Sequence, residues 1–345
     1  MTAVEQAQEW VGIEATGIYM PPHVETARDI AEKAGIPEDV IREKFGLVQK
    51  HIADPSVHAG DMAVEAARSI LQKVDPLDID VIIYFGSPYK EYPVWSCAAK
   101  IQHLLGAKNA YAFEMMNVSS CFPIALKVAK DMLTSDPSIR NILLVAGCKE
   151  SQIIDYANVR SRFMFNFADG GAAALVTRGR PKSRILASHI ITDGSFYDDV
   201  KIPAGGSVRP ATAETVQQRL HYIDVKDPRD MKERLDPVSV PNFVKAVEKS
   251  LEKSGLTKES IDLLLPLHTK RSMFEELLQQ LGLQEEQAVY LDHFGHMSAL
   301  DPCIGLHLAV EEGKIGKGGI AVAVSAGTGY TWASTVIEWL GNDVH

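Results

Sequence analysis

The chain has 345 residues, too many for a single small core, so we expect either two domains or one large duplicated fold. Hydrophobic residues make up 46% of the chain and charged residues 23%, which lets buried apolar surface support the fold without a structural metal or disulfides. Lys and Arg number 35 against 45 Asp and Glu, and this net charge of -10 opposes binding to phosphate backbones. We therefore expect no nucleic-acid partner.

The four cysteines, at positions 97, 121, 148 and 303, lie far apart and form no CxxC pair. This spacing predicts neither a disulfide framework nor a zinc site, and reduced thiols are the default for such a chain. The N-terminal segment lacks the basic and apolar regions of an export signal, and no window approaches 18 uninterrupted apolar residues. We expect a cytoplasmic protein with no membrane association and no metal site.

Helical and strand-length patterns alternate along the first half of the chain. In order, they predict a helix at 63–71, a strand at 80–86, a helix ending at Leu105 and Gly106, a strand at 110–113, a polar turn with Ser119, a helix at 123–133 and a strand at 142–146. Segments 204–210 and 227–232 interrupt this periodicity and are predicted to be loops beside the site rather than a linker.

The second half repeats the same order. It predicts a helix at 246–255, a strand at 262–268, a helix ending at Leu281 and Gly282, a strand at 288–291, a polar turn with His296, a helix at 302–310 and a strand at 320–324. The alternation predicts an α/β fold with sheets covered on both faces, in two halves of residues 1–178 and 179–345. The alternative is that there is no true repeat, because any two α/β stretches share a similar order of helices and strands.

Ser119 lies where a predicted strand leads into a helix, in the segment 117–123 (NVSSCFP). A helix N-terminus presents backbone N–H groups and a positive dipole end, which stabilise a developing oxyanion beside a nucleophile. The alternative is that Ser119 or Ser120 only caps the helix. Cys121 competes for the nucleophilic role, since a thiol is intrinsically the better nucleophile.

A serine nucleophile requires a base, and the second half offers two histidines at suitable places. His268 ends the predicted strand 262–268, and His296 lies in the turn equivalent to that of Ser119. A duplicated sheet brings matching strand ends together, although a lone histidine at a strand end is often structural. Asp301 follows His296 by five residues and either orients its imidazole or caps the next helix.

Two segments, 168–176 and 325–332, are rich in glycine. Neither fits the GxGxxG pattern after a first strand, so dinucleotide binding has little support. Glycine allows close approach of the backbone, which serves packing or supplies a second oxyanion donor from Gly327, Thr328 and Gly329.

Taken together, these segments resemble the thiolase superfamily and, within it, the ketoacyl-acyl-carrier-protein synthase III branch. The resemblance covers nearly the whole chain and rests on segments 17–21 (GIYMP), 45–52 (FGLVQKHI), 112–126, 167–176 (FADGGAAALV) and 327–334 (GTGYTWAS). It implies a duplicated five-layer α-β-α-β-α fold and a homodimer.

Enzymes of this branch use a cysteine nucleophile, a histidine and an asparagine. In this sequence the matching positions hold Ser119, His268 and His296, so two of the three residue types differ. The set Ser119, His296 and Asp301 is similar to that of a smaller branch in antibiotic pathways. Replacing the asparagine by a second histidine supplies a base near the new hydroxyl.

The resemblance also implies the substrates. Donors would be acyl-CoA or an acyl group on the phosphopantetheine of an acyl carrier protein, with no tightly bound cofactor. Lys44, Arg160 and Arg162 lie near the expected CoA contacts, although Val40 replaces the tryptophan that stacks on adenine. Loss of that indole weakens CoA binding by roughly 1 kcal/mol, which favours carrier-bound donors without excluding CoA.

The sequence therefore predicts a 3-oxoacyl-acyl-carrier-protein synthase III-like acyltransferase. Ser119 would take the acyl group, with His296 as base, Asp301 as its orienting carboxylate and His268 assisting acid–base or oxyanion work. Condensation with a second substrate is favoured. The alternatives are acyl transfer to a hydroxyl or amine, and a non-catalytic partner subunit of an active synthase.

Overall fold

The computed structural model describes residues 9–341 and contains two central sheets. The first sheet has the order β1-β7-β6-β4-β5, and the second has the order β11-β12-β13-β8. Strands of the first sheet are β1 (Trp10–Tyr19), β4 (Val81–Tyr84), β5 (Tyr111–Glu114), β6 (Asn141–Lys149) and β7 (Asp169–Gly179). Strands of the second sheet are β8 (Ser183–Thr192), β11 (Leu263–Pro266), β12 (Ile320–Gly327) and β13 (Thr331–Trp339).

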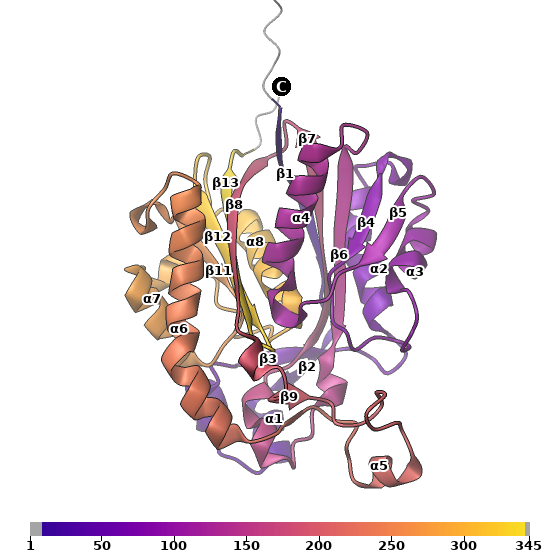
Figure 1. Cartoon of the computed structure of the whole chain (residues 1–345), viewed down its shortest axis with the longest axis vertical. Helices are drawn as coiled ribbons and strands as arrows, with labels where there is room; N and C mark the ends of the chain where they lie inside the picture. Colours follow the sequence, from indigo (N-terminus) through magenta and orange to yellow (C-terminus); the bar gives the residue numbers. More distant parts are fainter. Residues whose placement is uncertain (1–8, 342–345) are drawn as a thin grey trace, which may run out of the picture.

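Helices form three layers around these sheets (Figure 1). Helices α4 (Cys121–Ser135) and α8 (Asp301–Glu311) lie between the sheets and share one core with both. Helices α2 (Ala59–Leu71) and α3 (Cys97–Leu105) cover the outer face of the first sheet, and α6 (Pro228–Lys253) and α7 (Arg271–Leu281) cover that of the second. The predicted five-layer thiolase-like α/β fold is confirmed.

Smaller elements gather at the lower end of the molecule in Figure 1. They include the strand pairs β2 (His23–Thr26) with β3 (Gln49–Ile52) and β9 (Val200–Lys201) with β10 (Asp224–Val225), and the helices α1 (Ala27–Ala34) and α5 (Ala213–Gln217). Short helical turns include η1 (Val40–Lys44), η3 (Val118–Ser120), η4 (Glu150–Ile153), η5 (Val159–Met164) and η9 (Ser298–Leu300). These turns surround the site described below.

Each sheet draws its strands from one part of the chain. All strands of the first sheet lie within residues 10–179, and all strands of the second lie within 183–339. The expected division between residues 178 and 179 thus falls at the end of β7. Helices α4 and α8, one from each part, occupy matching places between the sheets, and each begins beside a polar turn.

Two predicted elements are wrong. Segment 227–232 is not a loop, because Pro228 opens α6 and Asp227 caps it by accepting hydrogen bonds from the N–H groups of Arg229 and Asp230. Segment 288–291 is not a strand, since Ala288 makes only an isolated bridge to Leu264 of β11. The N-terminal segment, which is expected to hold no export signal, lies largely outside the described residues. In residues 9–341, none of the helices is long and apolar enough to cross a bilayer.

Candidate active site

Ser119 lies in η3, at the turn that leads from the first sheet into α4. Val118, immediately before it, has a φ of 46°, a left-handed conformation that a β-branched residue rarely adopts. The turn is fixed by the second half of the molecule. Ser325 Oγ on β12 donates to the carbonyl oxygen of Ser119 at 2.6 Å. A Cβ on Gly327 would lie 2.5 Å from the carbonyl oxygen of Asn117, so the turn approaches β12 closely enough to require glycine there.

His296 reaches Ser119 from the other half. Its Nε2 lies 3.0 Å from Ser119 Oγ, and its Nδ1 lies 2.6 Å from Asp301 Oδ2. Because a carboxylate only accepts hydrogen bonds, Nδ1 carries the proton and Nε2 is free to accept from the serine hydroxyl. All three side chains are buried. The structure therefore brings together the three residues that the sequence predicted as nucleophile, base and orienting carboxylate.

Asp301 is the first residue of α8 and is fully buried. Its Oδ2 also accepts the backbone N–H of His268 at 2.7 Å, and its Oδ1 accepts that of Met297 at 2.8 Å. Burial alone would lower the pKa of His296, but the attraction and hydrogen bond of Asp301, with a smaller contribution from Glu150, raise it overall. The imidazolium that forms when His296 takes a proton is thus stabilised in place.

The ring of His268 forms hydrogen bonds with residues other than Ser119, His296 and Asp301. Its Nε2 lies 3.0 Å from the carbonyl oxygen of Gly46, which can only accept, so Nε2 carries the proton. Its Nδ1 then accepts from Asn166 Nδ2 at 2.9 Å. Burial lowers the pKa of His268 to about 4, so the ring is neutral. In this arrangement its side chain contacts Asn166 and Gly46 rather than Ser119, and only its backbone N–H reaches the triad, through Asp301.

Cys121 points away from the site. It is fully buried in the core between the sheets, and its Sγ lies 3.8 Å from the carbonyl oxygen of Met115. Burial raises the pKa of its thiol to about 12, which leaves almost no thiolate at neutral pH. A two-residue step along the helix turns the side chain by about 200°, in agreement with this placement.

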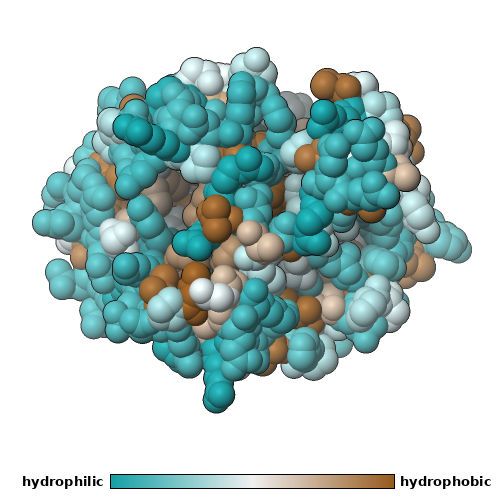
Figure 2. All heavy atoms as spheres, turned by 90° about the horizontal axis from the view of Figure 1, so that it is seen from below, coloured by the Kyte–Doolittle hydropathy of each residue, from teal (hydrophilic) through white to brown (hydrophobic). Residues whose placement is uncertain are grey.

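A cavity of about 1110 Å³ opens beside Ser119 and His296. Figure 2 views the molecule from the side of α1 and α5 and shows hydrophobic side chains gathered around a hollow in an otherwise hydrophilic face. Most of the lining is apolar, from residues such as Phe163, Ile202, Met231 and Tyr330. Its size and lining suit a ligand with a long apolar part.

The three predicted CoA-binding residues are all exposed, but they differ in their contacts. Lys44 is exposed in η1 and lines the cavity. Arg160 is exposed, and its guanidinium pairs with the carboxylate of Asp224. Arg162 is exposed on the same turn. Thr328 lines the cavity beside the Gly327 turn, where the backbone N–H groups of 327–329 were expected to face an oxyanion.

Two polar residues in the cavity wall were missed in the sequence. Glu150 is buried, accepts from Ser87 Oγ at 2.6 Å, and has a pKa raised by burial. Asn166 is also buried, and its Oδ1 has no hydrogen-bond partner. Glu150 follows β6 directly, so the rule that polar residues at the carboxyl ends of parallel strands gather at one edge could have identified it. Asn166 lies in an irregular segment and carries no such signal.

Comparison with known proteins identifies the family of the chain. Two family models match, 3-oxoacyl-[acyl-carrier-protein (ACP)] synthase III over residues 113–194 and the C-terminal domain of the same family over residues 251–339. The chain is 33% identical over 332 residues to a β-ketoacyl-[acyl-carrier-protein] synthase III of Caldanaerobacter subterraneus, covering 95% of this chain and 97% of the relative. The chain therefore belongs to the 3-oxoacyl-acyl-carrier-protein synthase III family.

Other relatives and solved structures support this assignment. A β-ketoacyl-[acyl-carrier-protein] synthase III of Syntrophomonas wolfei is 30% identical over 338 residues, covering 95% of this chain and 97% of the relative. The crystal structure of the synthase III of Aquifex aeolicus superposes with a TM-score of 0.81 at 27% identity, covering 95% of this chain and 100% of that one. The priming β-ketosynthase of the R1128 polyketide pathway shares the fold, with a TM-score of 0.82 at 24% identity, covering 96% of each chain.

The titration of His296 tests the role of Asp301. In the wild-type protein we expect its pKa to lie above the ordinary value of 6.5, and in Asp301→Asn to fall below it, because burial then acts without the opposing carboxylate. Stability contributed by this pair is fully present below pH 6.5 and is lost as the pH rises through the raised pKa. NMR of the imidazole signals measures the titration directly.

Asp292→Asn is the matched control. Asp292 pairs with His293 through an exposed bond of 2.8 Å between Oδ1 and Nδ1, so this variant also removes a carboxylate from a histidine nearby in the chain. We expect the His296 titration to stay unchanged in Asp292→Asn. An equal shift in both variants would show that Asp301 has no special influence on His296.

Proposed function

We propose that the protein is an acyltransferase that carries the acyl group as an ester on Ser119. The chain of contacts from Ser119 through His296 to Asp301 carries this proposal, because it joins a hydroxyl, a base and an orienting carboxylate beside an apolar cavity. Membership in the synthase III family supports acyl transfer as the reaction class.

In the first half-reaction, Ser119 Oγ attacks the carbonyl carbon of an acyl thioester while His296 Nε2 takes the hydroxyl proton. The tetrahedral intermediate collapses as the carbon–sulfur bond breaks, and the departing sulfur takes the proton back from His296. An acyl ester on Ser119 and a free thiol result. Asp301 remains ionised and stabilises the imidazolium between the two proton transfers.

Stabilisation of the oxyanion would come from backbone N–H groups. We assign it to Ser119, at the N-terminal end of α4, and to the turn of Gly327, Thr328 and Gly329. Their close approach, with Ser325 bonded to the Ser119 carbonyl, supports this assignment. His268 then acts through its backbone N–H, which holds Asp301 in place.

The donor would be acyl-CoA or an acyl group on the phosphopantetheine of an acyl carrier protein, with no tightly bound cofactor. The apolar lining of the cavity suits the acyl chain, and Lys44 at its wall suits a phosphate of the carrier. The salt bridge between Arg160 and Asp224 reduces what that arginine offers to CoA, which favours a carrier-bound donor.

Acyl-enzyme formation tests the nucleophile. Incubation with acyl-CoA and with acyl carrier protein, followed by intact-mass measurement and peptide mapping, should give one acyl group per chain on Ser119. The Ser119→Ala variant should lose this adduct completely, and Cys121→Ser should retain it, because Cys121 is buried away from the cavity. An adduct that persists in Ser119→Ala, or that maps to Cys121, would reject the assignment. No adduct in the wild type with either donor would favour a non-catalytic partner subunit.

Two reactions can follow the ester, and they differ in the acceptor. Condensation, the reaction of the family, requires N–H donors for the enolate of the incoming thioester, a task of the family's histidine and asparagine. Here His268 donates to Gly46, and His296 replaces the asparagine. The cavity wall also contains the buried carboxyl of Glu150, a hydrogen-bond acceptor. These observations favour a second candidate, transfer to a hydroxyl or amine.

Single-turnover discharge of the isolated acyl-enzyme distinguishes the two acceptors. We expect an amine or alcohol to discharge the ester faster than malonyl-acyl carrier protein does, because the His268 N–H is already bonded to Gly46 and His296 stands in place of the family's asparagine. Acyl-enzyme loss and CO₂ release are measured together. Stoichiometric CO₂ with faster discharge by the malonyl thioester would instead establish condensation.

We also propose a homodimer that pairs through β5. This strand forms one edge of the first sheet, and Tyr111 is 52% exposed there, with Met116 just beyond it 69% exposed. An apolar, unpaired strand edge is a site for association with another chain.

A cytoplasmic location remains a prediction of the sequence, consistent with cysteines that are unpaired and buried.

Light scattering checks the dimer. The wild-type chain should have twice the monomer mass, and the double variant Tyr111→Lys/Met116→Lys should be a monomer, because two buried lysines would face the same edge of the partner. Tyr197→Lys is the control, since Tyr197 is 79% exposed and lies outside β5. A dimer that survives both charges, or a wild-type monomer, would refute pairing through this edge.

A further inference from the structure

Lys50 on β3 is a fully buried lysine outside the triad. Its Nζ donates to the carbonyl oxygens of Phe165 at 2.9 Å and Phe167 at 2.7 Å. Glu25, its register partner on β2, lies 3.9 Å away through Oε2. Burying an ammonium group is costly unless its hydrogen bonds and charge are met. Here two carbonyls and the carboxylate of Glu25 meet that requirement, so the ammonium group joins β3 to β2 and to segment 165–167.

The segment that Lys50 binds is the one that holds His296. Asn166, between the two phenylalanines, accepts the backbone N–H of His296 at 2.9 Å, and the N–H of Ala168 donates to the carbonyl oxygen of His296 at 2.9 Å. Lys50 therefore binds segment 165–168 through the carbonyls of Phe165 and Phe167, and His296 pairs with the same segment through Asn166 and Ala168.

Lys50 also contacts the turn that precedes His296. Gly295 has a φ of 83°, and a Cβ there would lie 2.7 Å from the Cβ of Lys50 and 2.8 Å from the carbonyl oxygen of Asn166. The side chain of Asn166, in turn, donates to the ring of His268. The stem and ammonium group of Lys50 therefore support both sides of the His296 backbone and, one step removed, the ring of His268.

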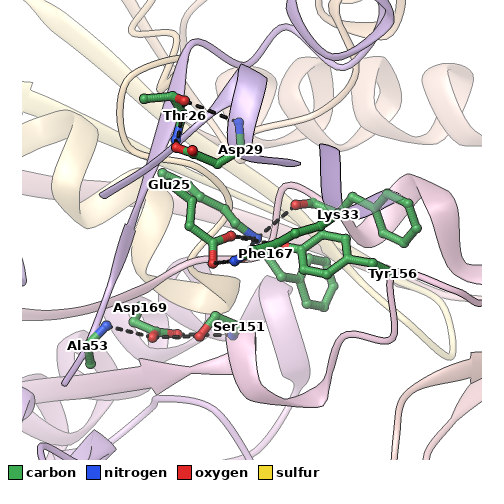
Figure 3. Close-up of polar contacts among 11 residues, drawn as sticks. Glu25, Thr26, Asp29, Lys33, Ala53, Ser151, Tyr156, Phe167 and Asp169 are labelled. Atoms are coloured by element: carbon green, nitrogen blue, oxygen red, sulfur yellow. Dashed lines mark hydrogen bonds and ion pairs between the residues drawn. The ribbon is translucent and has the colours of Figure 1, made fainter. Parts of the chain in front are cut away.

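Surrounding polar residues hold this arrangement in place. Figure 3 shows Glu25 beside Tyr156 and Phe167, and shows Asp169 between Ala53 and Ser151. Tyr156 donates its hydroxyl to Glu25 Oε2 at 2.8 Å. Asp169, which follows the clamped segment, accepts the N–H of Ala53 on the chain just after β3 at 2.8 Å. Segment 165–169 is thus bonded to Lys50 on β3 and, through Asp169, to Ala53 just after β3.

We propose that Lys50 is a positioning residue that sets the placement of His296 against Ser119 and Asp301, by clamping the segment 165–168. The proposal rests on the proposed role of His296 as the base. Its effect is mechanical, through two carbonyl bonds and the packing of Gly295, and Lys50 makes no contact with substrate. Misplacement of a catalytic group by about 1 Å can slow a reaction by about 100-fold.

Lys50→Met keeps much of the buried stem and removes both carbonyl bonds. We expect acyl-enzyme formation to slow by about 10- to 100-fold, with the apparent KM for the donor changed less than about twofold, because Lys50 itself does not line the cavity. We also expect the pKa of His296 to fall. Its shift comes from Asp301 and Glu150, so a fall would report a looser contact with Asp301. Lys50→Arg, which keeps the charge, should show a smaller loss of the same kind.

Lys149→Met is the matched control. Lys149 is also buried and binds three backbone carbonyls, those of Asp54, Pro55 and Val57, none of which contacts His296. It should lose stability while the acylation rate of its folded fraction and the His296 titration stay unchanged. Equal behaviour of the two methionine variants per folded molecule, in rate and in titration, would overturn the proposal.

If Lys50→Met does not fold, Lys50→Arg is measured alone, and unchanged rate and titration in that variant would overturn the proposal. If the wild type forms no acyl-enzyme, the proposed function fails, but NMR of the His296 imidazole still decides whether Lys50 positions it. A changed titration in Lys50→Arg or Lys50→Met would then support the positioning role without the chemistry.

Discussion

Asp301 is the constraint on which the site depends. A carboxylate without solvent is stable only when its oxygens are satisfied, and here two backbone N–H groups and the His296 ring satisfy them at the start of α8. The same contacts fix the tautomer of His296 and oppose the effect of burial on its pKa. Without this carboxylate the buried imidazole would resist protonation, and the proposed mechanism would leave Ser119 without an effective base.

The duplicated fold explains why these groups meet. In each half a turn leads into a central helix, and each turn contains a non-glycine residue in the left-handed region, Val118 at 46° and Ser298 at 54°. Such residues persist where the surrounding structure over-determines the backbone. The contact between Ser119 and His296 therefore joins the two halves, as does the bond from Ser325 to Ser119. Displacing one half relative to the other would break both.

Repetition in the sequence was enough to predict most of the helices and the buried strands, and it located His296 through its equivalence with Ser119. The failures have physical causes. Segment 227–232 contains a proline that suits the first turn of a helix as well as a loop, and α6 continues through Pro237 and Pro241. The placement of the His268 ring was not predictable, because its partners, Gly46 and Asn166, lie on distant segments that no local pattern relates to it.

The burial of Lys50 was also not predictable from the sequence. A lysine in a short strand is ordinarily expected in solvent, and only the folded chain reveals that its ammonium group meets carbonyls more than 110 residues away. The backbone that carries His296 therefore lies between two buried charges. Asp301 binds the ring from one side, and Lys50 binds the supporting segment from the other. Burying either charge costs free energy that its hydrogen bonds must offset. Their retention is understandable if the exact position of one imidazole matters more to the protein than the free energy that burial of these charges costs.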